Sequence, residues 1–159
     1  MSGNRTLEMT VLMTPEMANF SGNVHGGALL NLLDRVAFTC ASRYSGRYCV
    51  TLSVDQVIFK KPIFVGELVT FLASINATGR TSMEVGIRVE AEAIQSGKVR
   101  HTNSCYFTCV AIDDDRKPVE VPKLIPDGDE ARKREEAAIL RRTLRQEFTR
   151  RHAEINGED

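Results

Sequence analysis

The sequence predicts an α+β fold in which an antiparallel sheet wraps around one long central helix, with a charged helix added at the C-terminus. Two observations predict this arrangement. A long, apolar helix follows a single short strand near the N-terminus. After that helix the hydrophobic period changes from 3.6 to 2 residues and stays at 2 through four strands joined by short turns. A sheet curled around the helix satisfies this order best, and 159 residues are enough for a substantial core.

The first two elements are a short strand and the central helix. Residues 6–12 are expected to form the strand, and residues 13–23 a loop rich in small polar residues. The helix is expected from about Gly26 to Tyr44. It should stop near Gly46, since glycine readily adopts the left-handed conformation that ends many helices.

Four strands are expected after the helix. Their alternating apolar residues place them at about 50–59, 68–75, 84–93 and 99–112. The strand at 84–93 has the cleanest alternation, and its charged face, which includes Glu84, is expected to meet water.

A charged helix is expected from about Glu130 to Glu154, outside the main domain. The predicted division is therefore a domain over residues 1–125 and a helical extension over residues 126–159. One thin apolar stripe should pack on the body or on a neighbouring subunit. Its residues are Ala137, Leu140, Leu144 and Phe148. Nucleic-acid binding is a weaker alternative, because the helix lacks interleaved aromatic residues.

Composition and charge exclude several functional classes. The formal net charge is zero, so nothing draws the whole molecule to nucleic acid or to an anionic membrane. No stretch has the length and apolar character of a secretory signal or a membrane span, which favours a cytoplasmic protein. No metal site is expected, since His101, Cys105 and Cys109 recur on a strand without a fourth ligand. Reduced core thiols are expected for the four cysteines, Cys40, Cys49, Cys105 and Cys109.

The most informative residue is Asp34, a carboxylate midway along the apolar helix. A helix that is apolar nearly all round belongs inside a fold, so Asp34 is expected in an apolar setting. Burying an unpartnered carboxylate costs several kcal/mol, roughly. A chain tolerates that cost where the carboxylate does chemistry or is held by a specific donor. A structural carboxylate paired with Arg35 or with a loop amide is the alternative.

The helix starts with a pattern that suits an oxyanion. Two consecutive glycines, Gly26 and Gly27, let a ligand approach backbone N–H groups at the positive end of the helix dipole. A flexible entry turn is the simpler interpretation of the pair. The neighbouring His25 is interpreted as a packing or hydrogen-bonding residue, since no nucleophile is suitably placed beside it. Asn19 in the preceding loop carries little information alone.

Taken together, Asn19, the His25-Gly26-Gly27 helix start and Asp34 resemble the hotdog-fold acyl-CoA thioesterases. The expected order of elements agrees with that fold. The resemblance covers about residues 6–125 and is closest to the acyl-CoA hydrolase branch that includes broad-range bacterial and brain-type enzymes. Further matching stretches are Ser53 to Pro62, Val65 to Val69, Gly79 to Val85, Phe107 to Ala111, and Val121-Pro122.

The resemblance implies hydrolysis of fatty acyl-CoA to a free fatty acid and CoA. Asp34 would be the general base or the nucleophile, and Asn19 would orient the water or the thioester carbonyl. Backbone N–H groups near Gly26 and Gly27 would hold the oxyanion. No cofactor is implied, because CoA is part of the substrate and product. The candidate CoA contacts are Lys60, Lys61, Arg80, Thr81 and Ser82. The simpler interpretation of Arg80, Thr81 and Ser82 is a hairpin turn, and that of the two lysines is a solvated strand end.

In related enzymes the site spans a dimer, with the asparagine of one subunit facing the aspartate of the other. The resemblance therefore implies a homodimer and favours a hexamer built as a trimer of dimers. Two other functions stay open. One is a non-catalytic module that binds acyl-CoA as a signal, and the other is an enoyl-CoA hydratase, for which His25 could pair with an aspartate.

Overall fold

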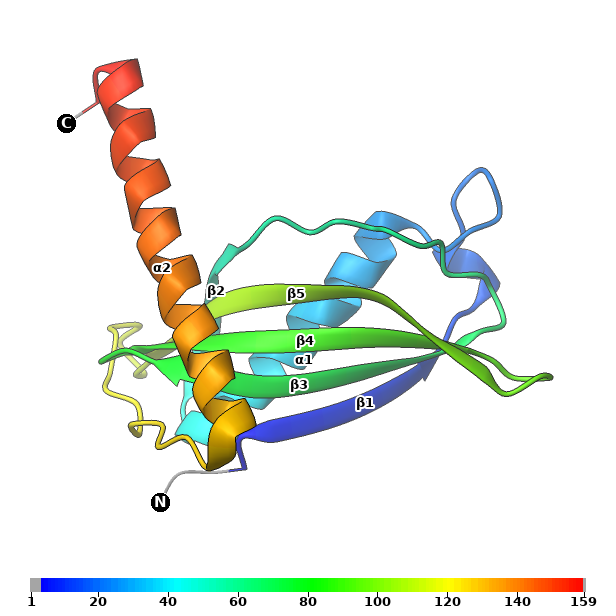
Figure 1. Cartoon of the computed structure of the whole chain (residues 1–159), viewed down its shortest axis with the longest axis horizontal. Helices are drawn as coiled ribbons and strands as arrows, with labels where there is room; N and C mark the ends of the chain where they lie inside the picture. The colour runs from blue at the N-terminus through cyan, green and yellow to red at the C-terminus, as the bar shows by residue number, and fades with distance from the viewer. Residues whose placement is uncertain (1–3, 159) are drawn as a thin grey trace.

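A five-stranded antiparallel sheet lies between two helices in the computed structural model, which describes residues 4–158 (Figure 1). The strand order is β1-β3-β4-β5-β2. The predicted fold class is confirmed. Residues 1–3 of the predicted domain 1–125 and residue 159 of the predicted extension 126–159 lie outside the described residues. The elements are β1 (Thr6–Leu12), a short 3-10 turn (Pro15–Met17), α1 (Gly26–Ser45), β2 (Tyr48–Val54), β3 (Leu68–Thr78), β4 (Ser82–Ala93), β5 (Lys98–Ile112) and α2 (Gly128–Asn156).

The core lies between α1 and one face of the sheet. Alternate residues of β3, such as Val69 and Phe71, point toward α1 and are fully buried. The buried face of α1 is formed at three- and four-residue spacing by Leu29, Leu32, Leu33, Val36, Ala37, Cys40, Ala41 and Tyr44. This helix matches the predicted range to within a residue. It ends at Gly46, whose φ of 66° is the left-handed conformation expected there.

The prediction that α1 is buried on all sides is wrong for the single chain. Asp34 is exposed, and Leu30 and Phe38 on the same side of the helix keep 36% and 37% of their surface. The physical reason is that one sheet covers only one side of a helix. The apolar residues on the other side stay uncovered within one protomer.

The strand predicted at 50–59 ends earlier, at Val54. Its register against β5 shifts between Thr51 and Ser53, which marks a bulge at Leu52. Asp55 donates its backbone N–H to the Tyr106 carbonyl (3.0 Å), and beyond it the chain leaves the sheet as a loop to Glu67. The alternation of apolar residues continued past the point where the strand separates from its partner.

Helix α2 crosses the face of the sheet opposite α1 and then extends beyond the body (Figure 1). Ala138 is buried there, and Arg141 binds Glu84 through two hydrogen bonds of 2.6 and 3.1 Å. Glu84 is only 6% exposed, so the expectation that it faces water is wrong: α2 covers it. Of the predicted apolar stripe, Leu140, Leu144 and Phe148 are 57–70% exposed and do not pack on the body of the same chain, so packing on a neighbouring subunit stays a prediction. No helix within residues 4–158 is long and apolar enough to cross a membrane.

Candidate active site on the open face of α1

The carboxylate of Asp34 lies on the open face of α1 and is held by one hydroxyl. Thr51 Oγ1 donates a hydrogen bond of 2.6 Å to Asp34 Oδ1. Within the described residues Asp34 forms no ion pair, so the alternative of a structural pair with Arg35 finds no support there. Its Oδ2 accepts no hydrogen bond from those residues and is open to a ligand.

Thr51 is the residue that the sequence did not indicate. It lies on β2 directly opposite Cys109 of β5, next to the bulge at Leu52. Bulges redirect side chains and are common beside active sites. A threonine on a strand is ordinary, and its partner Asp34 lies 17 residues away on another element. No local pattern could therefore have distinguished it.

Asn19 is fixed in a tight loop, and its amide nitrogen has no hydrogen-bond partner among residues 4–158. Its Oδ1 accepts three hydrogen bonds, from Ser21 N (2.9 Å), Ser21 Oγ (2.8 Å) and Asn23 N (3.1 Å). The loop is further closed by the backbone N–H of Asn19, which donates to Asn23 O (2.7 Å). With the oxygen occupied, the side chain presents Nδ2 as a hydrogen-bond donor. That is the polarity needed to bind a carbonyl oxygen.

Of the two backbone N–H groups predicted to hold an oxyanion, those of Gly26 and Gly27, one is free in the first turn of α1. His25 caps the helix, and its Nδ1 accepts a hydrogen bond of 2.9 Å from Gly27 N–H. This is the hydrogen-bonding role expected for His25, and it corrects the expectation for Gly27, whose N–H is already used. Gly26 N–H has no partner within residues 4–158. The Phe59 ring lies beside Gly26, where an added Cβ would approach it to 3.5 Å.

The free N–H of Gly26 and the carboxylate of Asp34 are too far apart to act on one bond. Eight residues separate them along α1, about 12 Å at 1.5 Å per residue. A reacting carbonyl must lie about 3 Å from both the attacking group and the oxyanion donor. One protomer therefore holds two halves of a site and cannot assemble both around one thioester.

The candidate CoA contacts lie in two groups that one chain does not bring together. Lys60 and Lys61 are exposed in the loop between β2 and β3 and follow Phe59, whose ring lies beside Gly26 at the start of α1. Arg80, Thr81 and Ser82 lie at the β3–β4 turn, at the opposite end of the sheet (Figure 1). Their backbone is fixed: the carbonyls of Arg80 and Thr81 accept hydrogen bonds of 3.0 Å from Val121 and Ala111.

Exposed apolar side chains surround the open face of α1. They come from the helix, from the edge strand β2 and from the loop after it, and are Leu30, Phe38, Tyr48, Leu52, Val54, Ile58 and Phe59. By contrast, a cavity of about 760 Å³ between α2 and the outer face of the sheet is lined by none of the predicted site residues. Asp34 therefore lies on an exposed apolar surface of the kind that binds a ligand or another protein.

The cysteine side chains are unsuited to nucleophilic chemistry. All four are buried and unpaired. Burial raises the pKa of Cys40, Cys105 and Cys109 to about 12, so these groups stay protonated near neutral pH. The open carboxylate of Asp34 is the better base.

Comparisons with known proteins find several close likenesses. Residues 21–98 match the Thioesterase superfamily. Protein VdlD of Helicobacter pylori is 52% identical over 139 residues, which are 87% of this chain and 79% of VdlD. The crystal structure of an apo-hexameric acyl-CoA thioesterase is 32% identical, superimposes with a TM-score of 0.87, and is covered over 92% of its chain and 91% of this one.

A Staphylococcus aureus acyl-CoA hydrolase, solved with butyryl coenzyme A, coenzyme A and coenzyme A disulfide, is 28% identical with a TM-score of 0.83. The match covers 96% of this chain and 95% of that one. Alanine variants of that hydrolase have been solved at an asparagine, an aspartate and a threonine. Those three positions are spaced by 15 and 17 residues, the spacings that separate Asn19, Asp34 and Thr51 here.

Proposed function

This chain belongs to the hotdog-fold acyl-CoA thioesterases of the Thioesterase superfamily, and from that membership we propose that it hydrolyses fatty acyl-CoA to a free fatty acid and CoA. The observation that carries the proposal is the Asp34 carboxylate, held by Thr51 through one oxygen with the other open, on an uncovered face of α1. A thioester is already activated toward water, so one base and one oxyanion site suffice for its hydrolysis.

The proposed reaction follows from the free groups of the site. The open oxygen of Asp34 takes a proton from water as the water attacks the thioester carbonyl, or attacks that carbon itself and is regenerated by hydrolysis. Negative charge develops on the carbonyl oxygen, where the Gly26 N–H and the Asn19 amide donate hydrogen bonds. The carbon–sulfur bond then breaks, CoA leaves as a thiol after taking a proton, and the fatty acid is released. No cofactor takes part in this scheme.

We further propose that each site uses two protomers. The separation of about 12 Å between Gly26 and Asp34 in one chain supports this assignment. Asn19 and Gly26 of one protomer would then face Asp34 and Thr51 of its partner, across an interface formed by the open face of α1 and the edge strand β2. A trimer of such dimers is the proposed full assembly, in line with the hexameric relative.

In the same pairing of protomers, the two groups of candidate CoA contacts would lie on one CoA molecule. Lys60 and Lys61 of one protomer, with Arg80, Thr81 and Ser82 of the other, would bind the phosphates and the polar end of CoA. The acyl chain would lie along the apolar side chains of the open face.

The test is release of CoA from palmitoyl-CoA by the purified protein, followed with a thiol reagent. Replacing Asp34 by Asn should lower the rate by about 10²–10⁴-fold, because the base is lost, while the oligomer stays folded. Asp129→Asn, which removes an exposed carboxylate from the first turn of α2, is the matched control and should keep full activity. Full activity of Asp34→Asn would remove the mechanism. Binding without release would favour the sensor, and water addition to an enoyl-CoA would favour the hydratase.

A further inference from the structure

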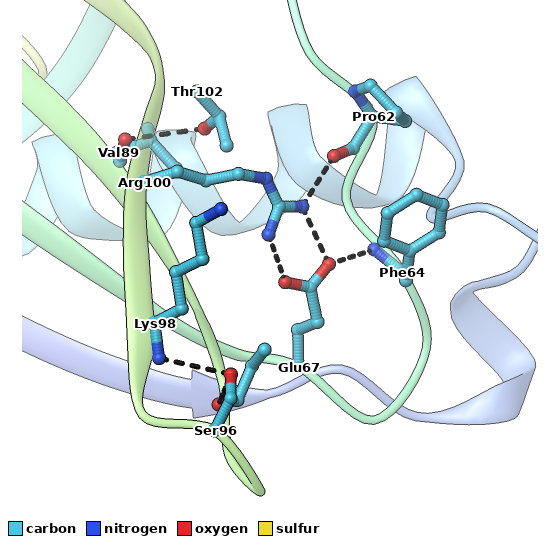
Figure 2. Close-up of polar contacts among 9 residues, drawn as sticks. Pro62, Phe64, Glu67, Val89, Ser96, Lys98, Arg100 and Thr102 are labelled. Atoms are coloured by element: carbon cyan, nitrogen blue, oxygen red, sulfur yellow. Dashed lines mark hydrogen bonds and ion pairs between the residues drawn. The ribbon is translucent and has the colours of Figure 1, made fainter.

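A buried ion pair fixes the loop that carries the two lysines. Glu67 is 6% exposed, and its carboxylate is bound by both terminal nitrogens of Arg100. Glu67 Oε1 also accepts a hydrogen bond of 2.7 Å from Phe64 N–H. The second nitrogen of Arg100 donates to the Pro62 carbonyl at 2.7 Å (Figure 2). We name Glu67, Arg100 and the Pro62 carbonyl the loop clamp.

The loop clamp joins distant parts of the chain. Arg100 comes from β5, 38 residues after Pro62, and Glu67 precedes β3. The Arg100 guanidinium also lies 5.5 Å from the centre of the Phe64 ring. Because an arginine presents a planar fork of donors, one side chain can fix a carboxylate and a carbonyl in one geometry.

The lysines lie between two held points of the loop. On one side, the Phe59 ring packs beside Gly26 at the start of α1. On the other side, Pro62 is held by Arg100. The loop is also anchored where Val57 packs against the core and where Ile63, which is buried, accepts a backbone hydrogen bond of 2.8 Å from Val24. Within the described part of the chain, residues 56–61 form no hydrogen bond of their own. The direction of Lys60 and Lys61 therefore depends in part on what holds Phe59 and Pro62.

We infer that Arg100 and Glu67 are positioning residues, which set Lys60 and Lys61 to receive the phosphates of CoA. This inference rests on the proposed function and adds residues that do not touch the substrate. Its physical reason is entropic: a flexible lysine pays less ordering free energy on binding a phosphate when its backbone is already fixed. Loss of the loop clamp should then weaken binding of the CoA part equally in the ground state and the transition state, which raises KM and leaves kcat nearly unchanged.

The experiment compares two substrates with the same acyl group. Hexanoyl-CoA carries the phosphates, and hexanoyl-N-acetylcysteamine lacks them. For Arg100→Gln, KM for hexanoyl-CoA should rise about 10-fold with kcat within about 3-fold, and the constants for the truncated thioester should not change. Arg88→Gln is the matched control, because it breaks an exposed ion pair with Glu90 on the same sheet and should change neither substrate. An equal loss on both substrates would show a merely structural role and overturn the inference.

A second experiment tests whether the loop clamp acts through the two lysines. In a Lys60→Gln/Lys61→Gln background, adding Arg100→Gln should cause no further rise in KM, because the positioned groups are already absent. An additive rise would contradict the inference. If Arg100→Gln fails to fold, Glu67→Gln gives the same comparison with a smaller change. If the wild-type protein released no CoA at all, the proposed function would be wrong. Calorimetric titration of CoA into wild type and Arg100→Gln would then still decide whether the loop clamp governs CoA binding.

Discussion

The contact between Thr51 and Asp34 is a hydrogen bond between a neutral donor and an ionised acceptor, at 2.6 Å. Such bonds are shorter and stronger than bonds between neutral groups. It fixes the side chain of Asp34 on a solvent-exposed helix face, where a carboxylate would otherwise sample several rotamers. In the proposed mechanism, Thr51 therefore acts through the position that it gives to Asp34.

Replacing Thr51 by Val should lower kcat about 10–100-fold, which corresponds to losing a hydrogen bond to a charged group. The valine keeps the shape and the β-propensity of threonine, so the fold should be retained. Steady-state CoA release measures the loss. Thr51→Ser restores the hydroxyl and should recover most of the rate; if serine were as poor as valine, the hydroxyl would not be the relevant group.

Glu67 gives a prediction for pH. Its hydrogen bonds with Arg100 lower the pKa of this carboxyl below the unfolded value of about 4.5. The ionised form therefore stabilises the fold above pH 4.5, and this contribution is lost as the pH falls through the folded pKa. Wild type should exceed Glu67→Gln in free energy of unfolding by about 1–3 kcal/mol at pH 7, and the difference should shrink below pH 4.5.

Urea unfolding at pH 7, 4.5 and 3 would measure this trend. Glu90→Gln is the control, since Glu90 pairs with the exposed Arg88 and should show little difference at any pH. If the difference in free energy of unfolding between wild type and Glu67→Gln stayed constant from pH 7 to pH 3, ionisation of Glu67 would not be what stabilises the fold.

At the scale of elements, α1 shows what a local pattern can predict. Its apolar spacing and Gly46 predicted its extent, and Gly26 and Asp34 were identified because they lie on that one stretch of chain. Asn19 was identified only through the resemblance to a family. The pairing of Glu84 with Arg141 joins residues 57 apart and depends on where α2 packs. The sequence pattern therefore placed Glu84 in water and did not indicate that Arg141 would lie against the sheet. Thr51 was missed for the same reason.

Helix α2 is attached to the sheet mainly through charged side chains, which gives a prediction for Arg141→Ala. The guanidinium binds Glu84 and lies 3.6 Å from the centre of the Tyr106 ring. Its loss leaves a buried carboxylate for which the Asn76 amide, 3.1 Å away, is the remaining donor among residues 4–158. We expect a cost of about 2–3 kcal/mol, below that of a fully buried pair because 22% of the Arg141 side chain is exposed.

The expected result is faster hydrogen exchange along α2, with the exchange of α1 and the inner strands unchanged. Arg150→Ala is the control, because the ion pairs of Arg150 in the described part of the chain join it to Glu147 and Glu154 on the same helix. Unchanged exchange in α2 of the Arg141 variant would show that another contact holds the helix.

At the scale of the whole molecule, the proposed two-protomer site predicts rescue between inactive chains. Asn19→Ala alone should lower turnover by about 10²-fold, and Asp34→Ala should abolish it. In a mixed dimer one site carries both defects and the other carries neither. Random pairing of equal amounts should therefore restore about 25% of wild-type activity, because half the dimers are mixed and each has one intact site of two.

Activity of the two variants refolded together measures this rescue. Mixed pairs isolated on two different tags should show about 50% of wild-type activity, because every pair then has one intact site of two. Chains mixed without exchange of subunits serve as the control and should stay inactive. Verified mixed pairs without activity would place the whole site within one chain.

The distance between the first turn of α1 and Asp34 has a genetic consequence. A chain carrying both Asn19→Ala and Asp34→Ala would still fold and associate, yet each wild-type chain that it joined would lose one half of both catalytic centres. Such an allele would be dominant-negative. Equal expression would leave only the pairs made of two normal chains, about a quarter of the total, as working enzyme.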